Sequence, residues 1–190
     1  MKMKIRALVV LLLLLPAVAF GQIIRLSPDA DILDISTGWV RSPNSGSWFT
    51  KIDDLSSGSA DDDYIYTQQN SAAGNLSFGG VRVFGVVDPP GSFASGDVVI
   101  NVRAIQLVGV STFSITATTD GFTVASTTFS PTTMWADHTL YIAGRKTREQ
   151  ITTYQIEISA GACQFFPSCG VAVSTAALEI SNATFRSGVL

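Results

Sequence analysis

Apolar and polar residues alternate along several stretches of this sequence with a period of two residues. This period is typical of β-strands that bury one face and leave the other face wet. The apolar positions of the three clearest stretches are Val98, Ile100, Val102 and Ala104, then Phe113, Ile115 and Ala117, then Tyr154, Ile156 and Ile158. Weaker patterns of the same kind predict strands at residues 64–67, 76–87, 121–129, 138–143 and 170–181.

Clusters of turn-forming residues separate these stretches, at residues 88–91, 95–97, 119–121 and 130–131. Many short strands at such spacing favour an antiparallel two-sheet β-sandwich over a parallel sheet, so the predicted fold class is all-β. Helical segments are predicted only within residues 48–55 and 145–152, each one or two turns long. Because no linker or internal repeat interrupts the chain, residues 22–190 are predicted to form a single domain.

The first 21 residues have the layout of a secretory signal peptide. Lys2, Lys4 and Arg6 precede an apolar run at residues 7–15, and small residues stand before a cleavage site at Gln22. The run is shorter than the roughly 20 residues that a membrane-spanning helix needs. The predicted product is therefore secreted, to the periplasm or the extracellular medium, without a membrane anchor.

The net charge of the chain limits the class of partner that it can bind. Without residues 1–21 the chain keeps nine of its 12 basic residues and all 15 acidic ones, a formal charge of −6. A surface of this sign repels phosphate backbones, so no nucleic-acid partner is expected. Only 14% of the residues are charged, and hydroxyl side chains supply much of the polarity. This composition suits the wet faces of β-sheets rather than long surface helices.

The two cysteines, Cys163 and Cys169, stand close together in the sequence. In an oxidising compartment such a pair is expected to form one disulfide, which closes a short loop and contributes about 2 kcal/mol. The CxxC spacing of metal and redox sites is absent.

An ordered set of segments carries a resemblance to a known group of proteins. The segments are Asp-Ile-Ser-Thr-Gly-Trp at 34–39, Ile-Asp-Asp at 52–54, Asp-Asp-Asp-Tyr-Ile-Tyr-Thr at 61–67, a strand–turn–strand pattern at 84–104, and matching stretches at 122–126, 135–140, 145–154 and 176–180. Together they resemble a loosely defined, largely uncharacterised group of small jelly-roll-like β-sandwich proteins of phage and environmental bacterial genomes. The resemblance implies a β-sandwich core over about residues 31–181 and a virion-associated or surface-associated structural role. The signal peptide and the cysteine loop depart from that pattern and favour a free secreted protein.

Five carboxylates crowd into eleven positions, namely Asp53, Asp54, Asp61, Asp62 and Asp63. Ca²⁺ is held by several oxygen ligands, and clustered loop carboxylates often supply them. The spacing does not match an EF-hand, however, and a solvated acidic turn that discourages edge pairing explains the same residues. No cofactor is expected apart from a possible Ca²⁺ ion at this stretch.

Aromatic side chains suggest a second candidate site. Trp39, Trp48, Tyr64 and Tyr66 are candidate ligand-binding residues, because exposed aromatic rings can stack on sugar rings. Trp135, Tyr141 and Phe93 could extend such a platform. Burial in the core is the alternative for any of these large side chains.

No motif in the chain specifies catalysis. His138 is the only histidine, and no GxSxG elbow accompanies it. Glu149, Glu157 and Glu179 could serve glycoside hydrolysis only if the fold placed two of them across a cleft. The sequence therefore predicts that the protein is not an enzyme.

The predicted function is that of a non-enzymatic, secreted interaction or structural module. It would display loops at one end of the sandwich, at residues 39–47 and 56–63, beside the cysteine loop. The alternative is a carbohydrate-binding module, with or without assistance from Ca²⁺ at the acidic stretch. The expected partner is an extracellular glycan or protein, and the oligomeric state is left open.

Overall fold

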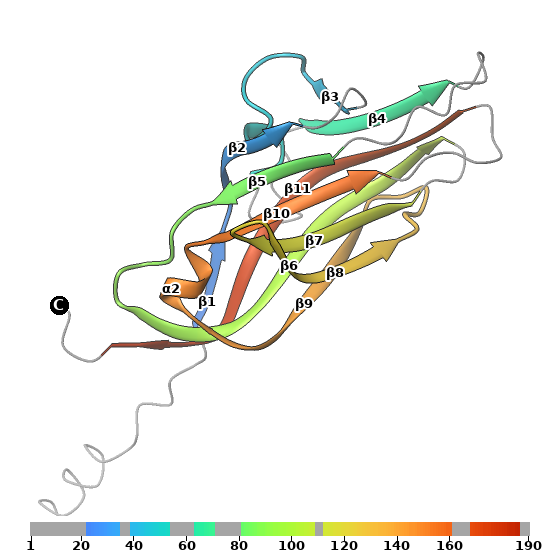
Figure 1. Cartoon of the computed structure of the whole chain (residues 1–190). Helices are drawn as coiled ribbons and strands as arrows, with labels where there is room; N and C mark the ends of the chain where they lie inside the picture. The colour runs from blue at the N-terminus through green and yellow to red at the C-terminus, as the bar shows by residue number, and fades with distance from the viewer. Residues whose placement is uncertain are drawn as a thin grey trace, which may run out of the picture.

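The computed structural model describes residues 22–34, 39–53, 63–70, 81–108, 112–160 and 168–186. Within these residues two antiparallel β-sheets pack face to face, which confirms the predicted all-β sandwich (Figure 1). The strands are β1 (Gln22–Leu26), β2 (Pro28–Asp34), β3 (Trp39–Ser42), β4 (Tyr64–Asn70), β5 (Val81–Val86), β6 (Phe93–Val108), β7 (Phe113–Thr119), β8 (Phe122–Phe129), β9 (Ala136–Thr147), β10 (Tyr154–Ala160) and β11 (Ser168–Phe185). The predicted signal peptide lies outside the described residues.

The larger sheet has six described strands, in the order β3-β4-β11-β6-β9, with β1 also paired to β11. β11 is 18 residues long, and several partners pair in succession along one of its two edges. β4 pairs with residues 168–173 of β11, and β1 pairs with residues 178–183. Between them the backbone N–H of Ala176 donates to the carbonyl of Ile52 at 2.9 Å. The other edge of β11 pairs with β6 along most of its length.

The smaller sheet has five described strands, in the order β2-β5-β10-β7-β8. Its register places apolar residues opposite one another on the inner face. Ile156 of β10 lies opposite Phe84 of β5 and Ala117 of β7, and Ile158 lies opposite Ile115. All five of these side chains are fully buried, so each row across the sheet contributes a complete apolar layer to the core.

The predicted alternation is confirmed where it was clearest. In β6 the residues 98, 100, 102 and 104 are buried while 99, 101 and 103 are not, and β7 and β10 bury their predicted apolar positions in the same way. Strands β1, β2 and β3 were not predicted, because their polar and acidic residues obscure the period. The two longest strands, β6 and β11, also differ from the short strands expected.

One predicted turn is wrong. Residues 95–97 lie inside β6 rather than between strands. Gly96 stands there because a Cβ atom at this position would lie 2.3 Å from Cγ2 of Ile180 on the neighbouring strand. The glycine thus permits a close approach between β6 and β11 and does not form a turn.

The predicted turn between β7 and β8 is confirmed. Asp120 and Gly121 both have positive φ angles, 49° and 79°. Two such residues in succession are the signature of a tight two-residue hairpin turn, whose twist matches the twist of the strands that it joins.

Both predicted helical segments are present but shorter than expected. The first is the 3₁₀ turn η1 (Phe49–Lys51), and the second is α2 (Arg148–Ile151), which begins only where β9 ends. The hydroxyl of Thr147 accepts from the N–H of Gln150, whose own side chain returns the bond in a capping box. Among the described residues, no helix is long and apolar enough to cross a bilayer.

Candidate functional site

The acidic stretch is described only at its two ends. Asp54, Asp61 and Asp62 lie outside the described residues. Asp63 accepts from Nζ of Lys51 at 2.6 Å, in an ion pair that the fold largely buries. Asp53 forms an isolated antiparallel bridge with Thr175. The described part of the chain assembles no group of three carboxylate, histidine or cysteine side chains suited to a metal ion, so a calcium site in this region stays a prediction.

The two tryptophans near the N-terminus lie at the edge of the core. Trp39 at the start of β3 is only 4% exposed. Trp48 is half-buried against the core, with the guanidinium carbon of Arg41 5.0 Å from its ring centroid. The carboxylate of Asp31 accepts from the backbone N–H groups of Trp48 and Phe49, at 3.0 and 2.9 Å, which fixes the start of η1. Trp39 is therefore too buried to stack on a ligand, and the ring of Trp48 is partly covered.

Tyr64 and Tyr66 point away from the core. Ile65 between them is fully buried, and side chains alternate along a strand, so both tyrosines lie on the outer face of the six-stranded sheet. Their ring centroids are 5.8 Å apart. The ring of Trp135 meets Tyr64 edge to face, with the two centroids 6.2 Å apart. We call Tyr64, Tyr66 and Trp135 the aromatic cluster, and each of its members is half-buried.

The members of the aromatic cluster come from opposite sides of the sheet. Trp135 precedes β9, which is separated from β4 by β11 and β6. Between β4 and β9 the same face carries Ala172 of β11, which lies opposite Tyr66 and Ile105 and is fully buried. A register shift between Val173 and Thr175 adds a bulge to β11 at this point. The result is a group of three half-buried aromatic rings on the outer face of the six-stranded sheet.

Polar side chains continue this face beside the aromatic cluster. Arg103 of β6 lies opposite Asp137 of β9, with Nη1 3.7 Å from Oδ1. In the next outward row the hydroxyl of Thr139 donates to Oδ1 of Asn101 at 2.7 Å. In the outward row after that, Tyr141 lies opposite Val99 and is 76% exposed. Six residues of strand separate Trp135 from Tyr141, a distance of about 20 Å.

Sequence reasoning did not single out Arg103, Asp137, Asn101 or Thr139 as site residues. The alternation of apolar and polar residues could have indicated two of them, because residues 101 and 103 occupy outward positions of β6. Their partners on β9 could not be inferred, since the pairing of β6 with β9 joins segments about 35 residues apart and depends on the tertiary fold.

His138 lies on the inner side of β9, in contact with two phenylalanine rings. Its ring centroid is 5.0 Å from that of Phe113 and 4.8 Å from that of Phe129. Burial lowers the pKa of His138 from its usual value, against the opposing effect of the Asp137 charge. Its Nε2 atom is buried without a hydrogen-bond partner among the described residues. This geometry offers no nucleophile for a catalytic dyad.

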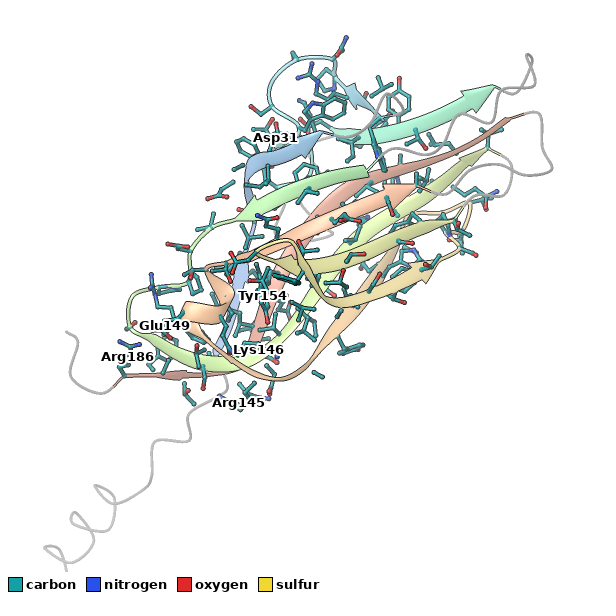
Figure 2. All side chains as sticks on the ribbon, viewed as in Figure 1. Asp31, Arg145, Lys146, Glu149, Tyr154 and Arg186 are labelled. Carbon is teal, nitrogen blue, oxygen red and sulfur yellow. The ribbon has the colours of Figure 1, made fainter. Side chains whose placement is uncertain are left out.

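The three candidate glutamates do not share a cleft. Glu157 is on the five-stranded sheet, Glu179 is on the six-stranded sheet beside Arg25, and Glu149 is in α2. Figure 2 shows Glu149 with Arg186 at the end of the fold, where Nη2 of Arg186 donates to Oε1 at 2.7 Å. Backbone and Thr147 hydrogen bonds lower the pKa of Glu149, with a further contribution from Arg186. A carboxyl group held ionised in this way is unsuited to act as a general acid.

Of the two loops predicted to be displayed, only the first lies wholly within the described residues. Residues 43–47 form an exposed loop after β3, whereas residues 56–62 lie outside the described residues. Cys163 also lies outside them, so the disulfide between Cys163 and Cys169 stays a prediction.

No protein-family model matches the chain, and no curated protein matches it. Solved structures with a partly similar backbone include one described as "CBM4 structure and function" (16% identity, 76% of this chain and 94% of that chain, TM-score 0.41). Another is TmCBM61 in complex with β-1,4-galactotriose (9% identity, 84% and 88%, TM-score 0.41). A third is the Stig cyclase Fisc from Fischerella sp. TAU in complex with an indole compound (8% identity, 87% and 100%, TM-score 0.38). At these TM-scores and identities the similarities do not bear on what this chain binds, and the resemblance to phage and environmental proteins stays a prediction.

Proposed function

We propose that this protein binds glycans on the outer face of its six-stranded sheet. The observation that carries the proposal is the meeting of Tyr64, Tyr66 and Trp135 on the outer face of the sheet, with ring centroids 5.8 and 6.2 Å apart. Pyranose rings have apolar C–H faces that stack on aromatic rings, while tyrosine hydroxyls and the indole N–H bond sugar hydroxyls. A half-exposed aromatic cluster on a sheet surface suits this chemistry better than it suits core packing.

The polar residues beside the aromatic cluster support the same ligand class. Arg103, Asp137, Asn101 and Thr139 offer donors and acceptors in two adjacent rows of the sheet. Their mutual contacts hold these groups in place before a ligand arrives, which reduces the entropy lost on binding. Neutral sugars with many hydroxyl groups match this mixed set of donors and acceptors. A strongly charged ligand would be repelled by either Arg103 or Asp137, whichever has the same sign of charge.

The exposed ring of Tyr141 sets the size of the ligand. It lies on the same face as Trp135, about 20 Å away along β9. An extended oligosaccharide could contact both rings, and a single sugar could contact only one of them. The proposed role is binding alone, and no catalytic step is part of it.

Binding is tested by affinity gel electrophoresis and titration calorimetry against xylan, β-glucan, mannan, galactan and chitin oligosaccharides. Trp135→Ala and Tyr66→Ala are each expected to weaken binding at least tenfold, which corresponds to about 1.4 kcal/mol. Met134→Ala is the matched control, because Met134 adjoins Trp135 and is 75% exposed without joining the cluster. Circular dichroism verifies that each variant is folded. The proposal fails if the wild-type protein binds none of these glycans, or if both cluster variants bind as the wild type does.

A further inference from the structure

The strand β8 forms one margin of the five-stranded sheet, where it pairs only with β7 (Figure 1). Its eight residues, Phe-Thr-Val-Ala-Ser-Thr-Thr-Phe, include no charged residue and no proline. Hydroxyl bonds hold it to β7, from Ser114 to Thr128 and from Thr116 to Ser126, both at 2.8 Å. β8 therefore offers an ordered row of backbone donors and acceptors along its outer side.

The other edge strands of the described sheets are protected against pairing. β1 carries Arg25, β3 has only four residues and carries Arg41, and β9 carries charges at 137, 145 and 146. β2 starts with a proline, has three aspartates, and pairs irregularly with β5. Charges, prolines, short length and irregular pairing are the usual means by which proteins prevent edge-to-edge association. Among the described edges, β8 alone carries neither a charge nor a proline over its eight residues, although its pairing with β7 shifts register at Val124, where β8 itself is bulged.

We propose that β8 pairs antiparallel with β8 of a second copy of this chain, about a two-fold axis near Ser126. The two five-stranded sheets then form one continuous sheet. A second copy fits this edge because its own β8 has the same length and is equally uncharged. The chain has 15 acidic and 12 basic residues, so two copies carry net charge of the same sign, and an uncharged strand brings no like charges together between them. The Thr, Val and Ser side chains of β8 are favourable cross-strand neighbours.

The end of β8 at Phe129 is already engaged by other residues. Phe129 contacts Phe113, with ring centroids 5.6 Å apart, and His138. The remainder of the strand, from Phe122 to Thr128, pairs with no described strand other than β7, and Phe122 is 75% exposed at its start. A two-fold axis near Ser126 lets most of this length take part in both copies.

The proposed pairing has a geometric consequence, which rests on the proposed glycan site. A two-fold axis perpendicular to the joined sheet keeps the outer faces of both six-stranded sheets on one side of the dimer. Both aromatic clusters then face the same direction. A dimer of this kind would hold an immobilised polysaccharide at two points, and avidity would exceed the affinity of each site.

The pairing is tested with charged variants at Ser126, whose side chain is exposed. Sedimentation equilibrium of the full chain is expected to show a concentration-dependent dimer. Ser126→Lys and Ser126→Glu should each weaken dimerisation at least tenfold, because like charges meet near the axis. An equimolar mixture of the two variants should recover the dimer, since opposite charges then face each other. Ser126→Ala is the control, because it loses only the bond to Thr116 and should dimerise as the wild type does.

A wild-type chain that stays monomeric at millimolar concentration overturns the pairing. So do charged variants that dimerise like the wild type, and so does a mixture that stays monomeric. The two proposals fail separately. A dimer that binds no glycan leaves the pairing intact, and a monomer that binds oligosaccharides leaves the glycan site intact. If both hold, Ser126→Lys should lose retention on immobilised polysaccharide while its affinity for a soluble oligosaccharide stays unchanged.

Discussion

Replacement of Lys51 by methionine is expected to destabilise the fold through a single ion pair. Nζ of Lys51 lies 2.6 Å from Oδ2 of Asp63, and the two side chains are only 8% and 14% exposed. Methionine preserves the length of the side chain but leaves the Asp63 carboxylate without its cation in a site that admits little water. Breaking a buried pair in this way costs about 3–5 kcal/mol.

The residual exposure of Asp63 places the expected loss at the lower end of this range, about 3 kcal/mol. For a chain of this size, each kcal/mol lowers Tm by roughly 2–4 °C, so Lys51→Met should lower Tm by roughly 6–12 °C. Urea unfolding followed by circular dichroism measures the free energy of unfolding directly. The double variant with Asp63→Leu should recover much of the loss, because the buried carboxylate is then removed together with the cation that faces it.

A surface ion pair of similar length provides the control. Nε of Arg25 lies 3.0 Å from Oε2 of Glu179, but the two side chains are 46% and 20% exposed. Arg25→Met should therefore cost less than about 1 kcal/mol. If Lys51→Met costs no more than this control, burial does not set the strength of the Lys51–Asp63 pair and the reasoning is refuted.

Two further predictions follow from close packing and from the single histidine. Gly96→Ala should cost about 1–3 kcal/mol in urea unfolding, because its Cβ would meet Ile180, whereas Gly91→Ala, with open space around it, should be nearly neutral. Burial lowers the pKa of His138 from its usual 6.5. The neutral ring therefore makes its full contribution to the stability of the fold above pH 6.5. This contribution is lost as the pH falls through the lower pKa of the folded state. His138→Phe should flatten the decline in stability between pH 7.5 and pH 5.5, and an unchanged decline would contradict this assignment.

The proposed glycan site was only partly predictable from sequence. Tyr64 and Tyr66 were recognised as candidates, and the burial of Ile65 between them explains why both reach the wet face. Trp39 is equally aromatic but occupies a core position at the start of β3. Composition alone cannot separate these cases, because an aromatic ring suits both a core and a binding surface.

The turn expected at residues 95–97 shows a similar ambiguity. Serine, glycine and aspartate in succession usually indicate a turn. In this fold the glycine is required because β6 and β11 come close together at Ile180. Glycine can form a turn or permit two strands to come close together, and only the neighbouring strand shows which role it has at this position.

In β6, β7 and β10 the sequence by itself determined which side chains face inward, because successive residues of a strand point to opposite sides and the apolar period of two records this directly. It also determined the hairpin at Asp120 and Gly121, where local backbone geometry decides the turn. The order of the strands was decided only by the tertiary structure, because backbone hydrogen bonds between strands are non-specific and join distant segments. That order brings Trp135 to Tyr64 across β11 and β6, and it leaves β8 at an open edge.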